Sequence, residues 1–240
     1  MTKFVHREMR RLMGKAIHEY GMTQQDDNIL VSVSGGKDSM SLLWLLRERL
    51  KRLPIDYEIT AVHVDPGFGA DNSKKMEAFF REKGFNYKIL TGDFGPVAHS
   101  DENLENPCFL CSMNRRKMVF ELASELNCNK VALGHHKDDI IETLFLNIFY
   151  GGSISTMLPV QEFFKGAVTV IRPLFMLDER VIARYAEEME FPEIKMGCPS
   201  EGVSKREDIK KMLQSLYRTN RKIKGNIFHA IRNVKPEYLP

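Results

Sequence analysis

The chain has 240 residues, of which 43% are hydrophobic and 28% charged, which suits one large α/β domain or such a domain with small appendages. The net charge of +3 does not by itself indicate a nucleic-acid partner, and four cysteines are too few for a disulfide scaffold in a chain of this length. No apolar run approaches the length of a membrane span and the N-terminus lacks the core of a signal peptide, so we expect a cytoplasmic protein without a membrane partner.

The first predicted element is an amphipathic helix. Between residues 3 and 20, apolar side chains recur at helical spacing, and Gly21 follows as a stop. Basic residues fall between the apolar positions. We therefore expect this helix to pack on the domain with its basic side outward.

A glycine turn between a short strand and a helix predicts a phosphate site. The strand is 29–33, and the turn is Ser34-Gly35-Gly36-Lys37-Asp38-Ser39. Adjacent glycines let the backbone approach a ligand, and the N–H groups of such a turn form an anion-binding nest at the start of the helix. Two serine hydroxyls and one lysine add donors. The spacing of a Walker A loop is absent, and an ordinary strand-to-helix turn is the alternative.

The rest of the chain alternates strands with helices, which predicts a doubly wound, Rossmann-like parallel sheet. Segments 91–107 and 153–167 are expected to be irregular. The expected strands lie at 57–64, 87–90, 130–133 and 168–171; the expected helices at 38–53, 71–83, 115–127, 137–150, 179–190, 204–221 and 226–232.

The ends of two further strands carry polar residues. His63-Val64-Asp65 follows one strand, and Gly134-His-His-Lys137-Asp-Asp139 follows another. Doubly wound folds bind their ligands at this edge of the sheet. Asp139 is either a metal ligand or an acidic residue of a solvated helix start, where such residues are common. The two histidines are either phosphate contacts or structural side chains.

Three of the four cysteines form a second candidate site. Cys108-x-x-Cys111 precedes a helix, and Cys198 lies in a late loop. A CxxC pair can be half of a zinc site, a redox dithiol or part of a cluster. Cys128, between a helix and a strand, is expected to be a buried small residue. Three thiols suit a cluster with one open iron or persulfide carriers without metal, and spacing alone leaves both open.

Two basic clusters are candidates for RNA binding. Arg115 and Arg116 follow the CxxC pair, and Lys210, Lys211 and Arg218 lie on a C-terminal helix. Such clusters bind phosphate backbones, although a solvated helix face is the alternative for each residue. RNA is the better explanation if both clusters converge on the cysteines.

The strand–SGGKDS–helix pattern resembles the PP-loop of the N-type ATP pyrophosphatases. Together with Cys108-x-x-Cys111, the stretch 134–152 and Cys198, it resembles the tRNA 2-thiocytidine biosynthesis (tRNA-cytidine 2-sulfurtransferase) family over about residues 5–239. The resemblance implies a fold of the adenine nucleotide alpha hydrolase type. It also implies an enzyme that uses ATP to adenylate a pyrimidine carbonyl oxygen in tRNA, with cytidine as the expected base, and then transfers sulfur.

The resemblance also implies the site residues. Cys108, Cys111 and Cys198 would hold a [4Fe-4S] cluster, and Asp38 and Asp139 would hold Mg²⁺. Lys37, Asp38, Asp139 and the three cysteines would be catalytic. ATP would bind at Ser34, Gly35, Gly36, Lys37, Asp38, Ser39, His63, Val64, Asp65, Gly134 and Lys137, with the 63–65 stretch contacting it chiefly through its backbone.

The implied partners are tRNA, a sulfur donor (sulfide or a desulfurase-derived persulfide) and a second copy in a homodimer. We divide the chain into an N-terminal helix (1–24), a PP-loop ATP pyrophosphatase domain (25–200) and basic C-terminal helices packed on it (201–240). Two alternatives remain. One is a PP-loop Fe–S enzyme that thiolates or desulfurates another base or a small molecule. The other is a non-catalytic nucleotide- or Fe–S-binding protein.

Overall fold

The computed structural model describes residues 3–69, 71–192, 194, 197–200, 202 and 204–238. The chain forms two compact units. Unit 1 comprises the described residues within Met1–His136 and Leu158–Glu201, and unit 2 those within Lys137–Met157 and Gly202–Pro240. The division at residues 24 and 200 that the sequence suggests stays a prediction.

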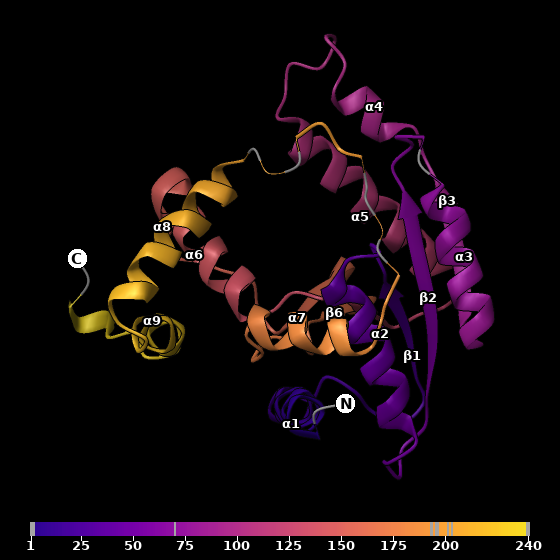
Figure 1. The fold of residues 1–240 in the computed structure, drawn as a ribbon, viewed down its shortest axis with the longest axis horizontal. Helices are drawn as coiled ribbons and strands as arrows, with labels where there is room; N and C mark the ends of the chain where they lie inside the picture. The colour runs from indigo at the N-terminus through magenta and orange to yellow at the C-terminus, as the bar shows by residue number, and fades with distance from the viewer. Residues whose placement is uncertain are drawn as a thin grey trace. The chain divides into compact units, whose positions relative to one another are not determined.

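Unit 1 is built on a six-stranded sheet of order β3-β2-β1-β4-β6-β5 (Figure 1). Neighbouring strands are parallel except for β5, which runs antiparallel to β6 at one edge. The predicted doubly wound α/β fold is thus confirmed. The strands are β1 (Asp27–Ser32), β2 (Tyr57–Asp65), β3 (Asn86–Thr91), β4 (Lys130–Ala132), β5 (Val160–Phe163) and β6 (Val168–Ile171).

Helices cover both faces of this sheet. Leu30, Val62 and Val131 of the sheet share a core cluster with residues of α4 and α5. The connection from β1 to β2 through α2 runs along the sheet toward β3, whereas the connection from β3 to β4 through α4 and α5 runs the other way. Because both connections are right-handed, α2 lies on the opposite face of the sheet from α4 and α5. On that face α7 packs on α2, and α1 packs on α7. The helices of unit 1 are α1 (Lys3–Glu19), α2 (Lys37–Leu50), α3 (Asn72–Lys83), α4 (Phe94–Ala98), α5 (Pro107–Glu125) and α7 (Glu179–Glu188).

The amphipathic N-terminal helix is present as predicted. Along α1 the apolar stripe is buried, and three of its members are Met9, Met13 and Ile17. The spacing of these residues places them on one face of the helix. That face packs toward α7, so the local periodicity identified both the helix and its buried side.

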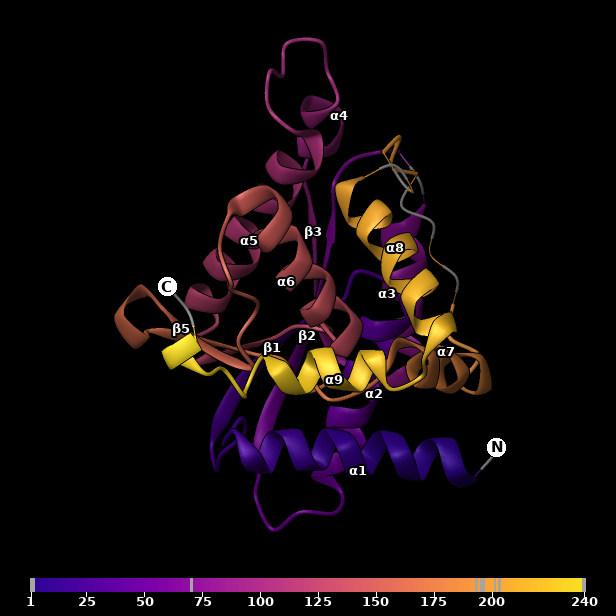
Figure 2. The ribbon, with the colours of Figure 1, turned by 90° about the vertical axis from the view of Figure 1, so that its left-hand side faces the viewer.

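Two segments predicted to be irregular contain regular structure. Within 153–167, β5 pairs with β6 through a hairpin whose turn is the short 3₁₀ helix η1 (Phe164–Gly166). Within 91–107, α4 forms, and the chain then makes a loop that protrudes from unit 1 before α5 (Figure 2). Asn106 caps α5 by accepting a hydrogen bond from the Phe109 N–H, and Pro107 occupies the first turn. The CxxC pair therefore lies inside the helix.

Unit 2 is a small helical unit with a core of its own. It consists of α6 (Lys137–Gly151), α8 (Lys205–Thr219), α9 (Ile223–Ala230) and the short η2 (Pro236–Tyr238). Ile141 of α6 packs with Ile209 and Leu213 of α8. The helix expected at 226–232 begins three residues earlier, at Ile223. None of the described helices has the length and hydropathy needed to cross a membrane.

A buried ion pair joins the two central strands at their N-terminal ends. Asp27 is 3% exposed, and its carboxylate lies 2.6 Å from Nζ of Lys130, which is 8% exposed. The same carboxylate accepts hydrogen bonds from the Asn129 side chain and the Gln24 N–H. The lysine charge is thereby compensated although β1 and β4 are enclosed on both faces.

Replacing Asp27 should destabilise the fold strongly. Asp27→Ala leaves the Lys130 ammonium buried without its partner, and such a loss costs about 3–5 kcal/mol of unfolding free energy. The matched control is Glu121→Ala, which removes the exposed Lys117–Glu121 pair and should cost less than about 1 kcal/mol. Urea unfolding followed by circular dichroism measures the free energy of unfolding of both variants. Equal losses would show that the buried pair does not stabilise the fold more than the exposed one.

Candidate functional site

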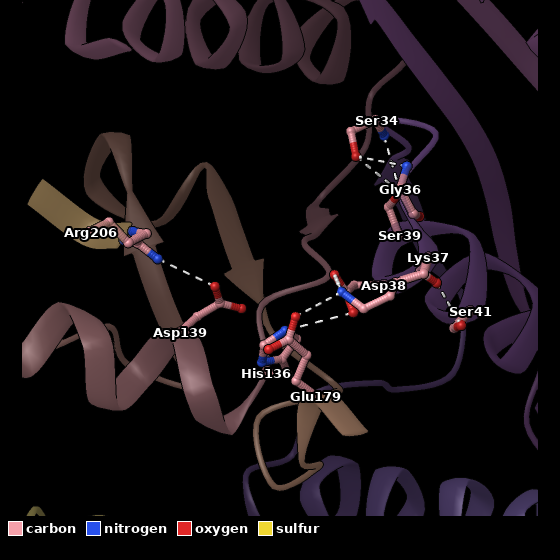
Figure 3. A network of polar contacts seen from close by, with 10 residues as sticks. All are labelled: Ser34, Gly36, Lys37, Asp38, Ser39, Ser41, His136, Asp139, Glu179 and Arg206. Carbon is pink, nitrogen blue, oxygen red and sulfur yellow. Dashed lines mark hydrogen bonds and ion pairs between the residues drawn. The ribbon is translucent and has the colours of Figure 1, made fainter. Parts of the chain in front are cut away.

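The phosphate turn is held in shape by the two serines that flank its glycines (Figure 3). The Ser39 hydroxyl donates to the Gly36 carbonyl oxygen at 3.0 Å and accepts from the Ser34 N–H at 3.2 Å. The Ser34 hydroxyl lies 3.2 Å from that of Ser39 and accepts from the Gly36 N–H. Gly36 precedes α2 and supplies no side-chain cap. The first turn of α2 thus keeps the positive end of its dipole for an anion.

Two glycines make room for this turn. Gly35 has φ +90°, and a Cβ on it would lie 2.7 Å from the Cβ of Ile194. Gly134, at the end of β4, lies so close to the start of α2 that its Cβ would be 3.0 Å from the Ser39 nitrogen. Gly36 is different, because its φ is −75° and a Cβ there would meet only the Ser34 hydroxyl at 3.5 Å.

Lys37 lies between two carboxylates. Its Nζ is 3.2 Å from Oδ2 of Asp38 and 3.1 Å from Oε1 of Glu179, the first residue of α7 (Figure 3). Burial by itself lowers the pKa of Lys37, but the two carboxylates outweigh burial and raise this pKa above its ordinary value. Nε2 of the buried His136 lies 3.7 Å from the other oxygen of Asp38. The turn therefore combines a charged ammonium with two carboxylates in contact with it.

The stretch that follows β2 is closely packed. His63 is fully buried, and its Nδ1 donates to the Val33 carbonyl oxygen at 2.8 Å, so this side chain braces the end of β1. Burial lowers the pKa of His63, which keeps the ring neutral near pH 7. Asp65 accepts from the Gly67 N–H and the Ser73 hydroxyl. Val64 is also buried, and the contact of the 63–65 backbone with ATP stays a prediction.

The acidic start of α6 belongs to unit 2. There Asp139 pairs with Arg206 at 3.3 Å, and Asp138 pairs with Lys224. Burial raises the pKa of Glu142 to about 7 although Arg206 opposes this shift. Asp38 lies in unit 1, so the joint magnesium role of Asp38 and Asp139 stays a prediction. The predicted contact of Lys137 with ATP also stays a prediction; its ammonium lies 5.4 Å from the Phe228 ring.

Three of the four cysteines influence one another. Burial raises the pKa of the Cys111 thiol, Arg115 lowers it through its charge and a hydrogen bond, and the Cys198 and Cys108 thiols raise it further. All four cysteines are free thiols. Cys128 is apart from the three. It is 3% exposed, its Sγ is 3.4 Å from the Asn28 side chain at the start of β1, and burial raises its pKa to about 11.

A histidine that the sequence did not single out contacts the loop of Cys198. Nδ1 of His99, just after α4, faces the Gly95 carbonyl oxygen at 2.9 Å. Its Nε2 lies 2.9 Å from the Ser200 hydroxyl and 3.8 Å from Sγ of Cys198. The Phe68 ring packs edge-on against this imidazole. His99 therefore ties the Cys198 loop to α4.

Cys108, Cys111 and Cys198 are thiols of the type that binds an iron–sulfur cluster, and the cluster itself stays a prediction. Within the described ranges, no three histidine, cysteine, aspartate or glutamate side chains are grouped to hold one ion. Thiolates on a cubane cluster each bind a different iron, so they need not converge as closely as the ligands of one ion. Three free thiols that interact electrostatically beside a guanidinium are compatible with such a group.

The residues predicted to bind RNA differ in their exposure to solvent. Lys211 and Arg218, seven residues apart on one face of α8, are exposed, whereas Lys210 is half-buried and acts on the charge of Glu142. On α5, Arg116 is exposed and Arg115 is turned to Cys111. The two clusters belong to different units, so their convergence on the cysteines stays a prediction.

Three contact residues escaped the sequence reasoning, namely Glu179, His99 and Ile194. None lies in a motif. Glu179 follows a helix cap and reads as an ordinary acidic first-turn residue. His99 follows a helix of five residues within a segment predicted to be irregular. The only available signal for Ile194 is an apolar residue close to Cys198 in a loop.

Comparisons with known proteins show the family and the fold of the chain. Residues 1–192 match the PP-loop domain family. The chain is 36% identical to the tRNA-cytidine(32) 2-sulfurtransferase of Geobacter sulfurreducens, over 98% of this chain and 92% of the relative. It is 40% identical to the protein of that name from Methylobacillus flagellatus, over 94% of this chain and 75% of the relative. The U34-tRNA thiolase NcsA from Methanococcus maripaludis, solved with its [4Fe-4S] cluster, has the same fold. Its TM-score is 0.79 at 24% identity, over 98% of this chain and 80% of that one.

The two glycines of the turn should respond differently to a methyl group. Gly35→Ala combines a left-handed backbone with a clash against Ile194, so it should lower the melting temperature and weaken ATP binding at least tenfold. Gly36→Ala has ordinary backbone angles and room for its Cβ, so its melting temperature should stay near that of the wild type. Calorimetric titration with ATP and thermal unfolding distinguish the two. A Gly35→Ala protein that binds ATP normally would contradict this account of the turn.

Proposed function

The chain belongs to the PP-loop domain family and, within it, to the tRNA-cytidine(32) 2-sulfurtransferases, and from this membership we propose that it thiolates a cytidine of tRNA at the expense of ATP. It is a transferase. The expected position is the one in the relatives' name, nucleotide 32. The reaction requires an activated pyrimidine oxygen and a sulfur source at the same place.

One observation carries this proposal. The segment after α7 approaches both candidate sites, because Ile194 lies against Gly35 of the phosphate turn and Cys198 lies against His99 and influences Cys111. Four residues of chain span at most about 14 Å. The phosphate turn and the cysteines are therefore within reach of one nucleotide substrate, as adenylation followed by sulfur transfer requires.

The first half of the reaction uses the phosphate turn. The carbonyl oxygen of a pyrimidine is a poor leaving group, and adenylation converts it into one that departs as AMP. The N–H groups at the start of α2 and the Lys37 ammonium bind the phosphates and stabilise the charge that develops on pyrophosphate, while Ser34 and Ser39 hold the turn in shape. Asp38 is the proposed carboxylate ligand of Mg²⁺, which needs few protein ligands.

The second half uses the cysteines. Cys108, Cys111 and Cys198 are the proposed ligands of a [4Fe-4S] cluster, which would present sulfur at an iron without a protein ligand. Arg115 supplies positive charge beside Cys111 and so favours the thiolate form that binds metal. His99 holds the Cys198 loop. The sulfur donor, sulfide or a persulfide, and the homodimer stay predictions.

Unit 2 has the surface chemistry of an RNA-binding element. Lys211 and Arg218 expose positive charge on α8, and Tyr150 at the end of α6 is 53% exposed with the Lys205 ammonium 4.4 Å from its ring. Exposed aromatic rings beside cations suit single-stranded loops, whose bases can stack on them. We infer that this unit contacts the tRNA.

Removing any proposed cluster ligand should abolish thiolation and spare adenylation. Purified without oxygen, the wild type should hold about four iron atoms per chain for a cubane cluster. Cys108→Ser, Cys111→Ser and Cys198→Ser should lose iron, brown colour and the 2-thiocytidine that mass spectrometry detects in tRNA.

The control for these variants is Cys128→Ala, which lies apart from the three thiols and should keep both iron and product. ATP binding should persist in all four proteins because the phosphate turn is untouched. An iron-free wild type that still thiolates tRNA would favour persulfide chemistry on the same cysteines.

Charge removal on α8 should change the salt dependence of tRNA binding. In the double variant Lys211→Ala, Arg218→Ala, the slope of log K against log salt should become shallower by about 1 to 2. The reason is that binding releases fewer counterions from the tRNA when fewer phosphates are contacted. Lys210→Ala, at a half-buried position near Glu142, is the matched control and should change the slope less. Identical slopes for the wild type, the double variant and Lys210→Ala would show that Lys211 and Arg218 lie on a solvated helix face and do not contact tRNA.

A further inference from the structure

Glu179 is a charged residue in contact with the phosphate turn that the proposed reaction has not used. It opens α7, and its Oε1 lies 3.1 Å from Nζ of Lys37, 142 residues earlier in the chain (Figure 3). We propose that Glu179 is a positioning residue that holds the Lys37 ammonium in place for the phosphates of ATP. This inference rests on the proposed function only in taking ATP as the ligand.

The contacts of Lys37 Nζ leave one of its donors for a ligand. An ammonium group has three N–H donors. Among the described residues its partners are the carboxylates of Asp38 and Glu179, so one N–H remains for an anionic ligand. Asp38 is the next residue on the same helix and moves with Lys37. Glu179 alone connects the ammonium to another element.

The position of Glu179 is set by the packing of α7. This helix packs on α2, whose first residue is Lys37, and it is anchored by Ile182 and Tyr185, both fully buried. The carboxylate therefore has a defined place relative to the phosphate turn. A long lysine side chain loses rotamer freedom when it binds a phosphate, and a partner that restricts it beforehand reduces that cost.

The pair has little to do with the stability of the fold. The side chains of Lys37 and Glu179 are 36% and 26% exposed, and ion pairs at such positions add little to folding free energy. The effect of Glu179 should therefore appear in ATP affinity and not in the melting temperature.

Two roles of Glu179 predict opposite signs. As a positioning residue it strengthens ATP binding, and Glu179→Gln should raise the dissociation constant several-fold. As a mere counter-ion it competes with the phosphates, and its neutralisation should strengthen binding because it leaves more positive charge at the turn. The side chain of Gln keeps the shape of Glu, so the sign reports on charge alone.

The test is calorimetric titration of the full-length protein with ATP and Mg²⁺, applied to Glu179→Gln, Lys37→Met and the double variant. We expect Glu179→Gln to weaken binding several-fold in the wild type and to have no further effect once Lys37 is Met, because Glu179 acts through Lys37. Glu179→Asp, which keeps the charge, should recover part of the affinity. The matched control is Glu187→Gln, an exposed position on the same helix, which should bind ATP as the wild type does.

Steady-state AMP release adds a second readout. Because Lys37 is proposed both to bind the phosphates and to stabilise the charge that develops on pyrophosphate, Glu179→Gln should raise KM for ATP and also lower kcat. Tighter ATP binding by Glu179→Gln, or an equal loss of affinity in the Lys37→Met background, would overturn the inference. Binding is measured without tRNA, so absence of thiolation would count against the proposed function and leave this result standing.

Discussion

The close approach of backbone segments at the phosphate turn is the constraint on which the rest of the site depends. The central strand β1 leads through a short turn to Gly35, whose conformation and surroundings exclude a side chain, and the end of β4 reaches the start of α2 only because residue 134 is a glycine. The absence of two Cβ atoms thus lets β1, β4 and α2 meet around a nest of N–H groups. Ser34 and Ser39 then hold the turn in shape without a ligand.

Charge is balanced locally around this turn. Lys37 is paired with carboxylates on its own helix and on α7, so its charge is compensated within unit 1. At the cysteines the group to be compensated is an anion, and Arg115 offsets the negative charge that a thiolate at Cys111 would bring. Under the proposed function, the phosphates of ATP and the cysteine sulfurs would each meet a cation that the fold has placed beforehand.

Residues of α7 and of the segment after it contact both candidate sites of unit 1. Glu179 contacts Lys37 at the start of this helix, Ile194 contacts Gly35 beyond its end, and Cys198 contacts His99. Ile194 and Cys198, four residues apart in the sequence, thus border the phosphate turn and the other cysteines respectively. This continuity gives a physical basis for an enzyme family that activates a base with ATP and then delivers sulfur to it.

Sequence alone determined the doubly wound sheet, the phosphate turn, the N-terminal helix and the separation of Cys128 from the other thiols, because each depends on local periodicity, turn chemistry or burial preference. It missed β5, whose four residues carry too little pattern and whose edge position comes from pairing with β6. It also missed α4, a single short helix within a glycine- and proline-containing stretch. Only the tertiary structure brought Glu179 to Lys37 and His99 to Cys198, whereas Arg115 meets Cys111 because the two lie four residues apart on α5. The first two contacts join residues about a hundred or more positions apart, and helix packing, not local sequence, decides which side chains meet across that distance.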